Sequence, residues 1–190
     1  MIMHRLRKHG ERAFTLIELL IVMSIIIVLA GLVIATSGYV QEKSKRSRTE
    51  AEIAAISAAL ESYKADNGIY PTNPATEALK ANSTIGVSEY QDAGKFLYIQ
   101  LAGDPDGNPT TPNDGRNYMG GTLKPNMLSP TPPNAGTYIR DPFGNCYGYS
   151  TVKSSVPTGL DGYNPTFDLW STGGIAPPVP SDQAKWIKNW

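Results

Sequence analysis

One long apolar segment dominates the hydrophobic pattern of this 190-residue chain. Residues 14–34 read FTLIELLIVMSIIIVLAGLVI and carry one charge, Glu18. A helix that rises about 1.5 Å per residue would carry this segment across about 30 Å, the thickness of the hydrocarbon layer of a bilayer. An acid inside such a layer is costly and is usually functional. The pattern therefore predicts a membrane-spanning helix in which Glu18 has a role beyond anchoring.

Two simpler interpretations of the apolar segment stay open. A secretory signal peptide would be cleaved after its apolar region, and Ala35-Thr36-Ser37 offers small residues for such a cleavage. The segment is, however, longer than the usual apolar run of about 7–15 residues. A plain membrane anchor would explain the length but not Glu18.

Basic residues flank the segment on its N-terminal side. Residues 1–13 hold one acid and four basic residues: Glu11, Arg5, Arg7, Lys8 and Arg12. A positive flank is retained in the cytoplasm, so the residues after the segment are expected on the exported side. Without residues 1–13, the chain keeps 13 of its 17 basic residues and 16 of its 17 acidic ones. Such a chain has no basic excess to attract nucleic acid.

A second helical pattern follows the apolar segment. Residues 41–67 contain no proline, and apolar residues recur there at spacings of three and four: Ile53, Ile56, Leu60 and Tyr63. Asn67-Gly68 is a typical helix stop. Nothing in residues 14–66 must break a helix, so we expect one continuous helix of about 80 Å. Gly31 and Gly38 would be its most flexible points.

The remainder of the chain is rich in turn residues, since most of its 18 Gly and 15 Pro follow Asn67. We expect a short helix within residues 74–86, centred on Glu77–Lys80, and an irregular stretch over residues 89–136 in which only Lys95–Leu101 is locally ordered. Short strands are expected at residues 137–140, 146–150 and 166–170. Pro177–Pro180 is expected to be extended, and Asp182–Trp190 to form a final turn anchored by Trp186, Ile187 and Trp190.

Histidine and cysteine usage excludes several enzyme classes. His4 and His9 both lie in residues 1–13, so a chain that loses this segment has no histidine. This excludes a Ser-His-Asp triad, a Cys-His pair and a histidine-ligated zinc site. Chemistry that uses carboxylates alone stays open, but we expect that the protein is not an enzyme. Cys146 is the only cysteine. It can form no intrachain disulfide, and we expect it to be buried and inert.

The junction between the basic flank and the apolar segment, RAFTLIE at residues 12–18, is the most specific feature of the sequence. It resembles the class III signal of type IV pilins and pseudopilins. The resemblance implies that a prepilin peptidase cleaves between Ala13 and Phe14 and methylates the new Phe14 amine. It also implies that Glu18 of an incoming subunit pairs with the Phe14 amine of a neighbour, because an acid and an amine that are both costly in lipid neutralise each other. Ala13 departs from the glycine that the family usually has.

Further motifs are similar to those of the major pseudopilin of type II secretion systems, the general secretion pathway protein G type. They are YKADNGIYPT at residues 63–72, DPFGNCYGY at 141–149, FDLWSTG at 167–173 and IKNW at 187–190. The resemblance implies an α+β, pilin-like fold, in which a long N-terminal helix with a transmembrane first half packs on a small antiparallel sheet with long loops. It divides the chain into a leader (1–13), a transmembrane and filament-core helix (14–38) and an exported domain (39–190).

The function that the resemblance implies is that of a structural subunit of a type II secretion pseudopilus, a filament that is assembled from the bacterial inner membrane and drives protein export. The implied partners are further copies of the chain, other pseudopilins, the prepilin peptidase and an inner-membrane assembly platform. The leader would be cytoplasmic and the C-terminal domain periplasmic. A type IV pilus or DNA-uptake pilin and a membrane-anchored periplasmic binding protein remain as alternatives.

Calcium is the one cofactor that the resemblance raises. The C-terminal loop of the family usually binds calcium through carboxylates and main-chain oxygens. In this chain Ile175 stands in the place of a ligand aspartate, whereas Asp182 matches the second acidic ligand. The loss of one carboxylate weakens a site for a hard cation. Calcium binding at Asp182 therefore competes with a loop that is held only by its tryptophans, Trp170, Trp186 and Trp190.

A second acidic motif, DPDGN at residues 104–108, has the start of an EF-hand calcium loop. Pro109 takes the position at which that loop needs glycine, and no Glu stands at the twelfth position. We therefore expect a polar turn here.

Overall fold

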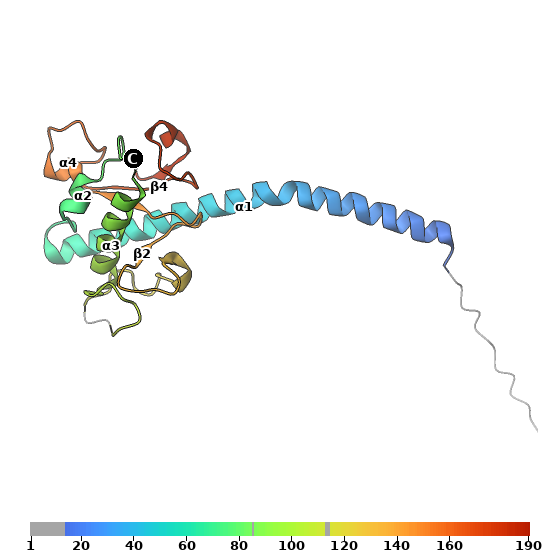
Figure 1. Cartoon of the computed structure of the whole chain (residues 1–190), viewed down its shortest axis with the longest axis horizontal. Coiled ribbons are helices and arrows are strands. Elements are labelled where there is room, and N and C mark those ends of the chain that lie inside the picture. The colour runs from blue at the N-terminus through green and yellow to red at the C-terminus, as the bar shows by residue number, and fades with distance from the viewer. Residues whose placement is uncertain (1–13, 85, 113–114) are drawn as a thin grey trace, which may run out of the picture. The chain divides into compact units, whose positions relative to one another are not determined.

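The computed structural model describes residues 14–84, 86–112 and 115–190. The chain divides into two compact units, Met1–Glu42 and Lys43–Trp190 (Figure 1). The first helix, α1 (Leu16–Asn67), contributes residues to both units. Ala13 and the rest of the predicted leader lie outside the described residues.

The helix α1 is continuous over 52 residues, as the sequence predicts. It ends at the predicted stop, because Gly68 adopts a φ of 80° and its N–H donates to the carbonyl oxygen of Lys64 at 2.7 Å. A left-handed residue directly after a helix satisfies one of the last carbonyl groups and turns the chain away. Gly31 and Gly38 lie within the helix.

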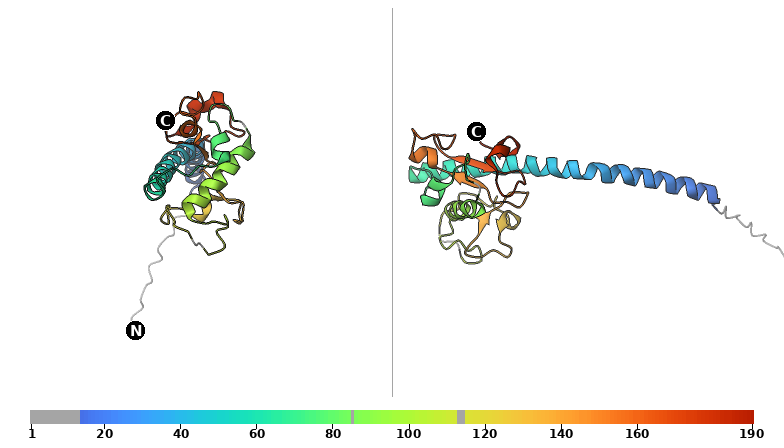
Figure 2. Two further views of the ribbon diagram at one scale, coloured as in Figure 1. Left: turned by 90° about the vertical axis from the view of Figure 1, so that its left-hand side faces the viewer. Right: turned by 45° about the horizontal axis from the view of Figure 1, so that its top comes forward.

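The second unit contains a small antiparallel sheet. Its three strands are β3 (Gly148–Ser150), β4 (Asp168–Ser171) and β5 (Ile187–Lys188), in the order β3-β4-β5. Two further strands, β1 (Leu128–Ser129) and β2 (Tyr138–Ile139), form a separate antiparallel pair. The predicted strands at residues 137–140, 146–150 and 166–170 are thus confirmed as β2, β3 and β4; each is shorter than predicted, and β4 ends one residue later, at Ser171. Figure 2 shows the ribbon in two further views.

Short helices fill the rest of the second unit. They are α2 (Pro74–Ala78), α3 (Val87–Ala102), α4 (Val152–Ser155) and the 3-10 helices η1 (Pro125–Met127) and η2 (Pro180–Lys185). The predicted helix within residues 74–86 is present but ends at Ala78, before the fully buried Leu79.

The predicted local order of Lys95–Leu101 is confirmed, because these residues lie in α3. The prediction of an irregular stretch before them was wrong, because α3 already begins at Val87. Tyr90, Leu97 and Leu101 face the core at helical spacing and are buried. A Cβ atom at Gly94 would overlap the sulfur of Cys146, so the glycine that weakens the helix signal is what lets α3 approach the sheet. Tertiary packing here overrides a weak local preference.

The tail also differs from its prediction. Pro180 starts η2 instead of ending an extended segment, and Ile187–Lys188 forms β5 instead of part of a turn. β5 pairs with β4, with Ser171 opposite Ile187. Two residues that pair with a distant strand leave no periodic pattern in the sequence.

The core of the second unit forms around the amphipathic stripe of α1. Ile56 and Leu60 are fully buried, and Tyr63 lies partly buried at the edge. They belong to one cluster with Tyr149 and Leu169 of the sheet and with Tyr147, which directly precedes β3. A helix that packs on a small antiparallel sheet confirms the predicted α+β, pilin-like fold class.

Candidate functional site

The first turn of α1 is closed by a reciprocal pair of contacts between Thr15 and Glu18. The Glu18 carboxylate accepts hydrogen bonds from the N–H of Thr15 at 2.9 Å and from its hydroxyl at 2.7 Å. The N–H of Glu18 donates in return to the Thr15 hydroxyl at 3.3 Å. This is a capping box, which satisfies N–H groups that the start of a helix leaves free. The T-x-x-E spacing at residues 15–18 signals it, but the sequence interpretation missed this role.

The predicted assembly residues lie at this same turn. Phe14 precedes the cap and is 85% exposed. Ala13, on the other side of the predicted cleavage, lies outside the described residues. The pairing of Glu18 with a Phe14 amine concerns a second copy of the chain, so it stays a prediction. Within one chain, the Glu18 carboxylate is bound by the N–H and the hydroxyl of Thr15.

The apolar part of α1 is exposed along its whole length. Every residue from 14 to 40 is exposed in the single chain. The polar side chains inside this segment bond to their own helix: Ser24 donates to the carbonyl of Ile21 at 2.7 Å, and Thr36 to that of Leu32 at 3.2 Å. Polar groups must be satisfied internally in lipid. Among the described residues, α1 is the one helix long and apolar enough to cross a membrane.

Asp141 organises the turn that starts the DPFG motif. It is 3% exposed, and its Oδ1 accepts hydrogen bonds from the N–H groups of Phe143 at 3.0 Å and Asn145 at 2.9 Å. Its Oδ2 accepts a hydrogen bond of 2.5 Å from the Ser171 hydroxyl. Burial raises the pKa of Asp141, although these hydrogen bonds act in the opposite direction. The sequence motif signals the turn but not the partner on β4.

Three tryptophans hold the C-terminal loop. Trp170 is fully buried and lies parallel to Trp186, with ring centres 6.1 Å apart, and edge-on to Trp190 at 5.7 Å. Its indole N–H donates to the hydroxyl of Tyr90 on α3 at 3.1 Å. Ile175 packs partly buried against the same cluster. The predicted packing of these tryptophans is therefore present.

Asp182 lies in η2, where its carboxylate accepts a hydrogen bond from the Lys185 ammonium at 2.8 Å. In the parts of the chain that the structure describes, no group of three or more His, Cys, Asp and Glu side chains is placed to hold a metal. Calcium binding through Asp182 stays an untested alternative to packing by the tryptophans alone, and the remaining ligands would be main-chain oxygens.

The DPDGN motif forms a turn that uses its own carboxylates. Asp104 is buried and accepts a hydrogen bond from the Tyr98 hydroxyl at 2.7 Å. The N–H of Asn108 donates to both Asp104 and Asp106. The prediction of a polar turn is confirmed.

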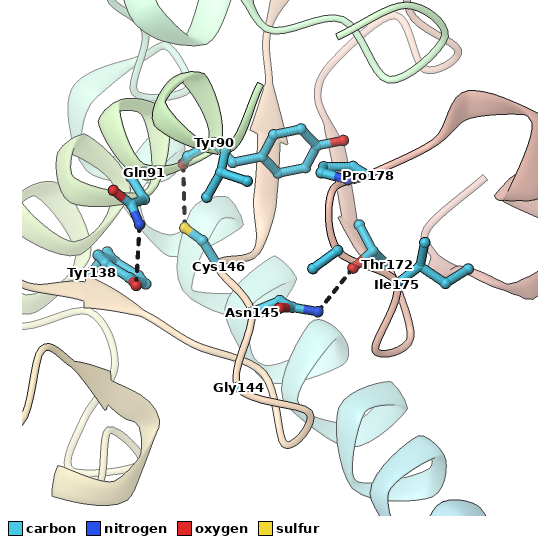
Figure 3. Close-up of a pocket in the computed structure, with 11 residues that line it drawn as sticks. Tyr90, Gln91, Tyr138, Gly144, Asn145, Cys146, Thr172, Ile175 and Pro178 are labelled. Atoms are coloured by element: carbon cyan, nitrogen blue, oxygen red, sulfur yellow. Dashed lines mark hydrogen bonds between the residues drawn. The ribbon is translucent and has the colours of Figure 1, made fainter. Parts of the chain in front are cut away.

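A groove of about 220 Å³ lies between α3 and the C-terminal loop (Figure 3). Residues that line the groove bond to one another: the Asn145 amide donates to the Thr172 hydroxyl at 3.2 Å, and the Cys146 thiol donates to the carbonyl of Tyr90, also at 3.2 Å. Cys146 is buried, as predicted, and burial raises its pKa far above the usual range. A thiol that stays protonated is a poor nucleophile, so the groove offers no reactive group from Cys146.

Two family models match the chain. The model described as "Prokaryotic N-terminal methylation motif" matches residues 8–34, which include the RAFTLIE junction. The model described as "Type II secretion system (T2SS), protein G" matches residues 38–118. The two matches follow one another along the chain in the order that the junction and the later motifs suggest.

Similar proteins extend this agreement toward the C-terminus. A type II secretion system core protein G of Dickeya chrysanthemi is 39% identical over 87% of this chain and 90% of its own length. Proteins of the same name from Aeromonas hydrophila and Pseudomonas aeruginosa are 34% and 28% identical, over 55% and 97% of this chain and 73% and 99% of their own lengths. No solved structure matches the chain significantly.

Proposed function

The chain belongs to the type II secretion system core protein G family, and from this premise we propose that it is a structural subunit of a type II secretion pseudopilus. The observation that carries the proposal is the similarity to a core protein G over 87% of the chain. The chain is a membrane-anchored protein. Its N-terminal methylation motif, at residues 8–34, includes the apolar part of α1, and this helix is long and apolar enough to cross a membrane. The fold agrees, because α1 supplies an exposed apolar segment before a compact second unit.

The alternative functions are not favoured. A type IV pilus or DNA-uptake pilin would share the methylation motif, but the relatives of this chain are named as secretion proteins. A periplasmic binding protein would explain neither the motif nor the family. The family is one of structural subunits, which indicates that the chain is not an enzyme.

We propose the following maturation. A prepilin peptidase cuts between Ala13 and Phe14 and methylates the new amine of Phe14. The leader stays cytoplasmic with its four basic residues, and the second unit is exported to the periplasm. The methylation motif at residues 8–34 supports this order of events.

Assembly then follows from the electrostatics of the apolar segment. The amine of Phe14 and the carboxylate of Glu18 are each costly in lipid. Pairing between neighbouring subunits removes both charges from the apolar surroundings and fixes the axial register. Further copies, other pseudopilins and an inner-membrane platform would be the partners, and the growing filament would drive protein export.

A deletion of the gene in the native host tests the proposed function. We expect that proteins normally released by the type II pathway accumulate in the periplasm, and that the full-length chain restores their release. Filaments sheared from cells that overproduce the chain should contain it. Intact export, combined with a loss of surface pili or DNA uptake, would instead show that the chain serves a pilus.

A further inference from the structure

A cluster of positive charges lies on α1 shortly after the predicted transmembrane helix (14–38), and its first member, Lys43, stands five residues beyond Gly38. The exposed apolar residues end at Val40, and the next turns carry Lys43, Lys45, Arg46 and Arg48 with no acid among them. At about 1.5 Å per residue, Lys43 lies about 4.5 Å along the helix beyond Val40. We call residues 43–48 the basic collar.

Most charges of the basic collar have no carboxylate partner. The Arg46 guanidinium donates to the carbonyl oxygen of Lys185 at 2.9 Å, and the Lys45 ammonium lies 5.7 Å from the centre of the Phe143 ring. Among the residues that the structure describes, Arg48 is the one member of the collar that forms an ion pair with a carboxylate, that of Glu52, at 2.7 Å. Within the described residues, Lys43 is exposed and has no ion-pair partner.

The acids that lie nearest do not cancel this charge. Glu42 precedes the collar and Glu50 follows it, and neither forms an ion pair with the collar among the described residues. Asp182 is already paired with Lys185. Residues 42–50 therefore hold four positive and two negative side chains.

The position of the collar along the helix indicates what it binds. Side chains that follow a membrane-spanning segment within one or two turns lie at the depth of the lipid headgroups. Successive residues of a helix are rotated by about 100°, so the four cations are spread around α1 instead of forming one stripe. Headgroup phosphates can reach such a helix from every side that the second unit leaves open, and Lys43 lies on an exposed side.

We propose that the basic collar binds the phosphate groups of anionic phospholipids on the exported side of the membrane. This site would fix how deeply α1 of an unassembled subunit is inserted in the bilayer before the subunit joins a filament. The proposal rests on membrane anchoring by α1 and does not depend on filament assembly.

Lipid selectivity of the full chain in bilayer nanodiscs tests the site. Electron paramagnetic resonance measures how strongly the protein restricts spin-labelled phosphatidylglycerol compared with spin-labelled phosphatidylcholine. We expect a preference for phosphatidylglycerol that weakens with added salt, since exposed charges are screened. Lys43→Gln should lower the preference about fivefold, the change expected for one lysine near an anionic surface.

Lys64→Gln is the matched control, because it removes the same charge from the same helix about 31 Å further along. It should leave the selectivity unchanged, since this distance exceeds the screening length of about 8 Å at physiological salt.

Equal restriction of both lipids by the inserted wild type, or equal effects of the two variants, would overturn the proposal. If Lys43→Gln changed only crosslinking between copies, the collar would bind protein instead. Failure of the wild type to float with vesicles would overturn the anchoring itself, and with it the proposed function.

Discussion

Ser171 on β4 donates a hydrogen bond of 2.5 Å to the buried carboxylate of Asp141, 30 residues earlier in the chain. The same carboxylate orders the turn that follows it through the N–H groups of Phe143 and Asn145. The DPFG and FDLWS motifs, which look independent in the sequence, are therefore two halves of one structural unit beside the C-terminal loop.

Removal of this hydrogen bond should destabilise the second unit. Ser171→Ala leaves a buried Asp141 oxygen without its hydroxyl donor, and a hydrogen bond to a charged group is worth about 1.5–3 kcal/mol. We expect the free energy of unfolding to fall by that amount. Urea titration of the detergent-solubilised chain measures it through tryptophan fluorescence, because all three tryptophans belong to or border one cluster.

Ser62→Ala provides the control for this measurement. Ser62 is exposed and its hydroxyl donates to the carbonyl of Ala58 within α1. Loss of that bond should change the free energy of unfolding little. Equal effects of the two alanine variants would contradict the role assigned to Ser171.

The stability of wild type and Asp141→Asn should diverge with pH. Burial raises the pKa of Asp141 above its ordinary value of 3.8, so the folded chain holds this proton to a higher pH than the unfolded chain does. The contribution of Asp141 to stability therefore falls as the pH rises from 3.8 through the raised pKa, and it grows on acidification.

The variant Asp141→Asn has no proton to titrate at this position. The difference in unfolding free energy, wild type minus Asp141→Asn, should increase as the pH is lowered from neutrality toward 3.8. Thermal melts at a series of pH values measure this difference. A difference that is constant, or that decreases on acidification, would show that the pKa of Asp141 is not raised in the folded chain.

Patterns that are local in sequence were sufficient for much of the fold. The periodic stripe through Ile56 and Leu60 predicted the second half of α1, and Asn67-Gly68 predicted its end. Alternating or aromatic runs between turn residues located β2, β3 and β4. Each of these signals comes from residues within a few positions of one another.

Features that depend on distant partners were not predictable in the same way. The strand β5 exists because Ile187 pairs with Ser171. The glycine inside α3 is accounted for by Cys146, whose sulfur leaves no room for a side chain at position 94. At the candidate site, the sequence motifs identified Glu18 but not its contact with Thr15, although the capping-box spacing was available.

The close approach of β3 to Trp170 predicts a cost for any side chain at Gly148. A Cβ atom there would overlap the Trp170 ring, which is fully buried. Gly148→Ala should lower the free energy of unfolding by about 1–3 kcal/mol, the usual cost of overpacking. Urea titration measures the change. Trp170→Phe should make room for the alanine side chain and relieve part of this cost. The loss of unfolding free energy in the double variant should then be smaller than the sum of the losses in the two single variants. Additive losses would argue against a contact between residue 148 and the Trp170 ring.

Chelation of calcium should change the stability of the chain little, because Ile175 stands where the family has a ligand aspartate. Melting temperatures of the full chain with calcium and with a chelator measure this effect. If the loop binds no calcium, Asp182→Ala removes only the surface ion pair with Lys185 and should lower the free energy of unfolding by at most about 1 kcal/mol. A large rise in melting temperature that is specific to calcium, and that Asp182→Ala abolishes, would instead establish a calcium site.

Glu18 has two roles that variants can separate: it caps its own helix through Thr15, and it is proposed to neutralise the Phe14 amine of a neighbouring subunit. Glu18→Leu removes both. It should insert into the membrane at least as well as wild type, because leucine replaces an acid, whose cost on insertion scales reaches about 2.5–3.5 kcal/mol at the centre of a span. In a filament, however, it would leave a buried amine unpaired, at about 3–5 kcal/mol for each contact. We expect normal membrane levels, normal cleavage between Ala13 and Phe14, and no filament.

Glu18→Gln keeps a side-chain oxygen that can accept from Thr15, so the capping box survives while the charge is lost. Thr15→Val does the reverse, because it removes the hydroxyl and leaves the carboxylate. If neutralisation drives assembly, Glu18→Gln should fail like Glu18→Leu, whereas Thr15→Val should assemble. Recovery of sheared filaments at equal expression, with N-terminal sequencing to confirm a mature chain that starts at Phe14, decides between the two roles. Filaments from Glu18→Gln but not from Thr15→Val would assign Glu18 to the cap and refute the pairing, and a mature chain that starts near Thr36 would refute the filament core altogether.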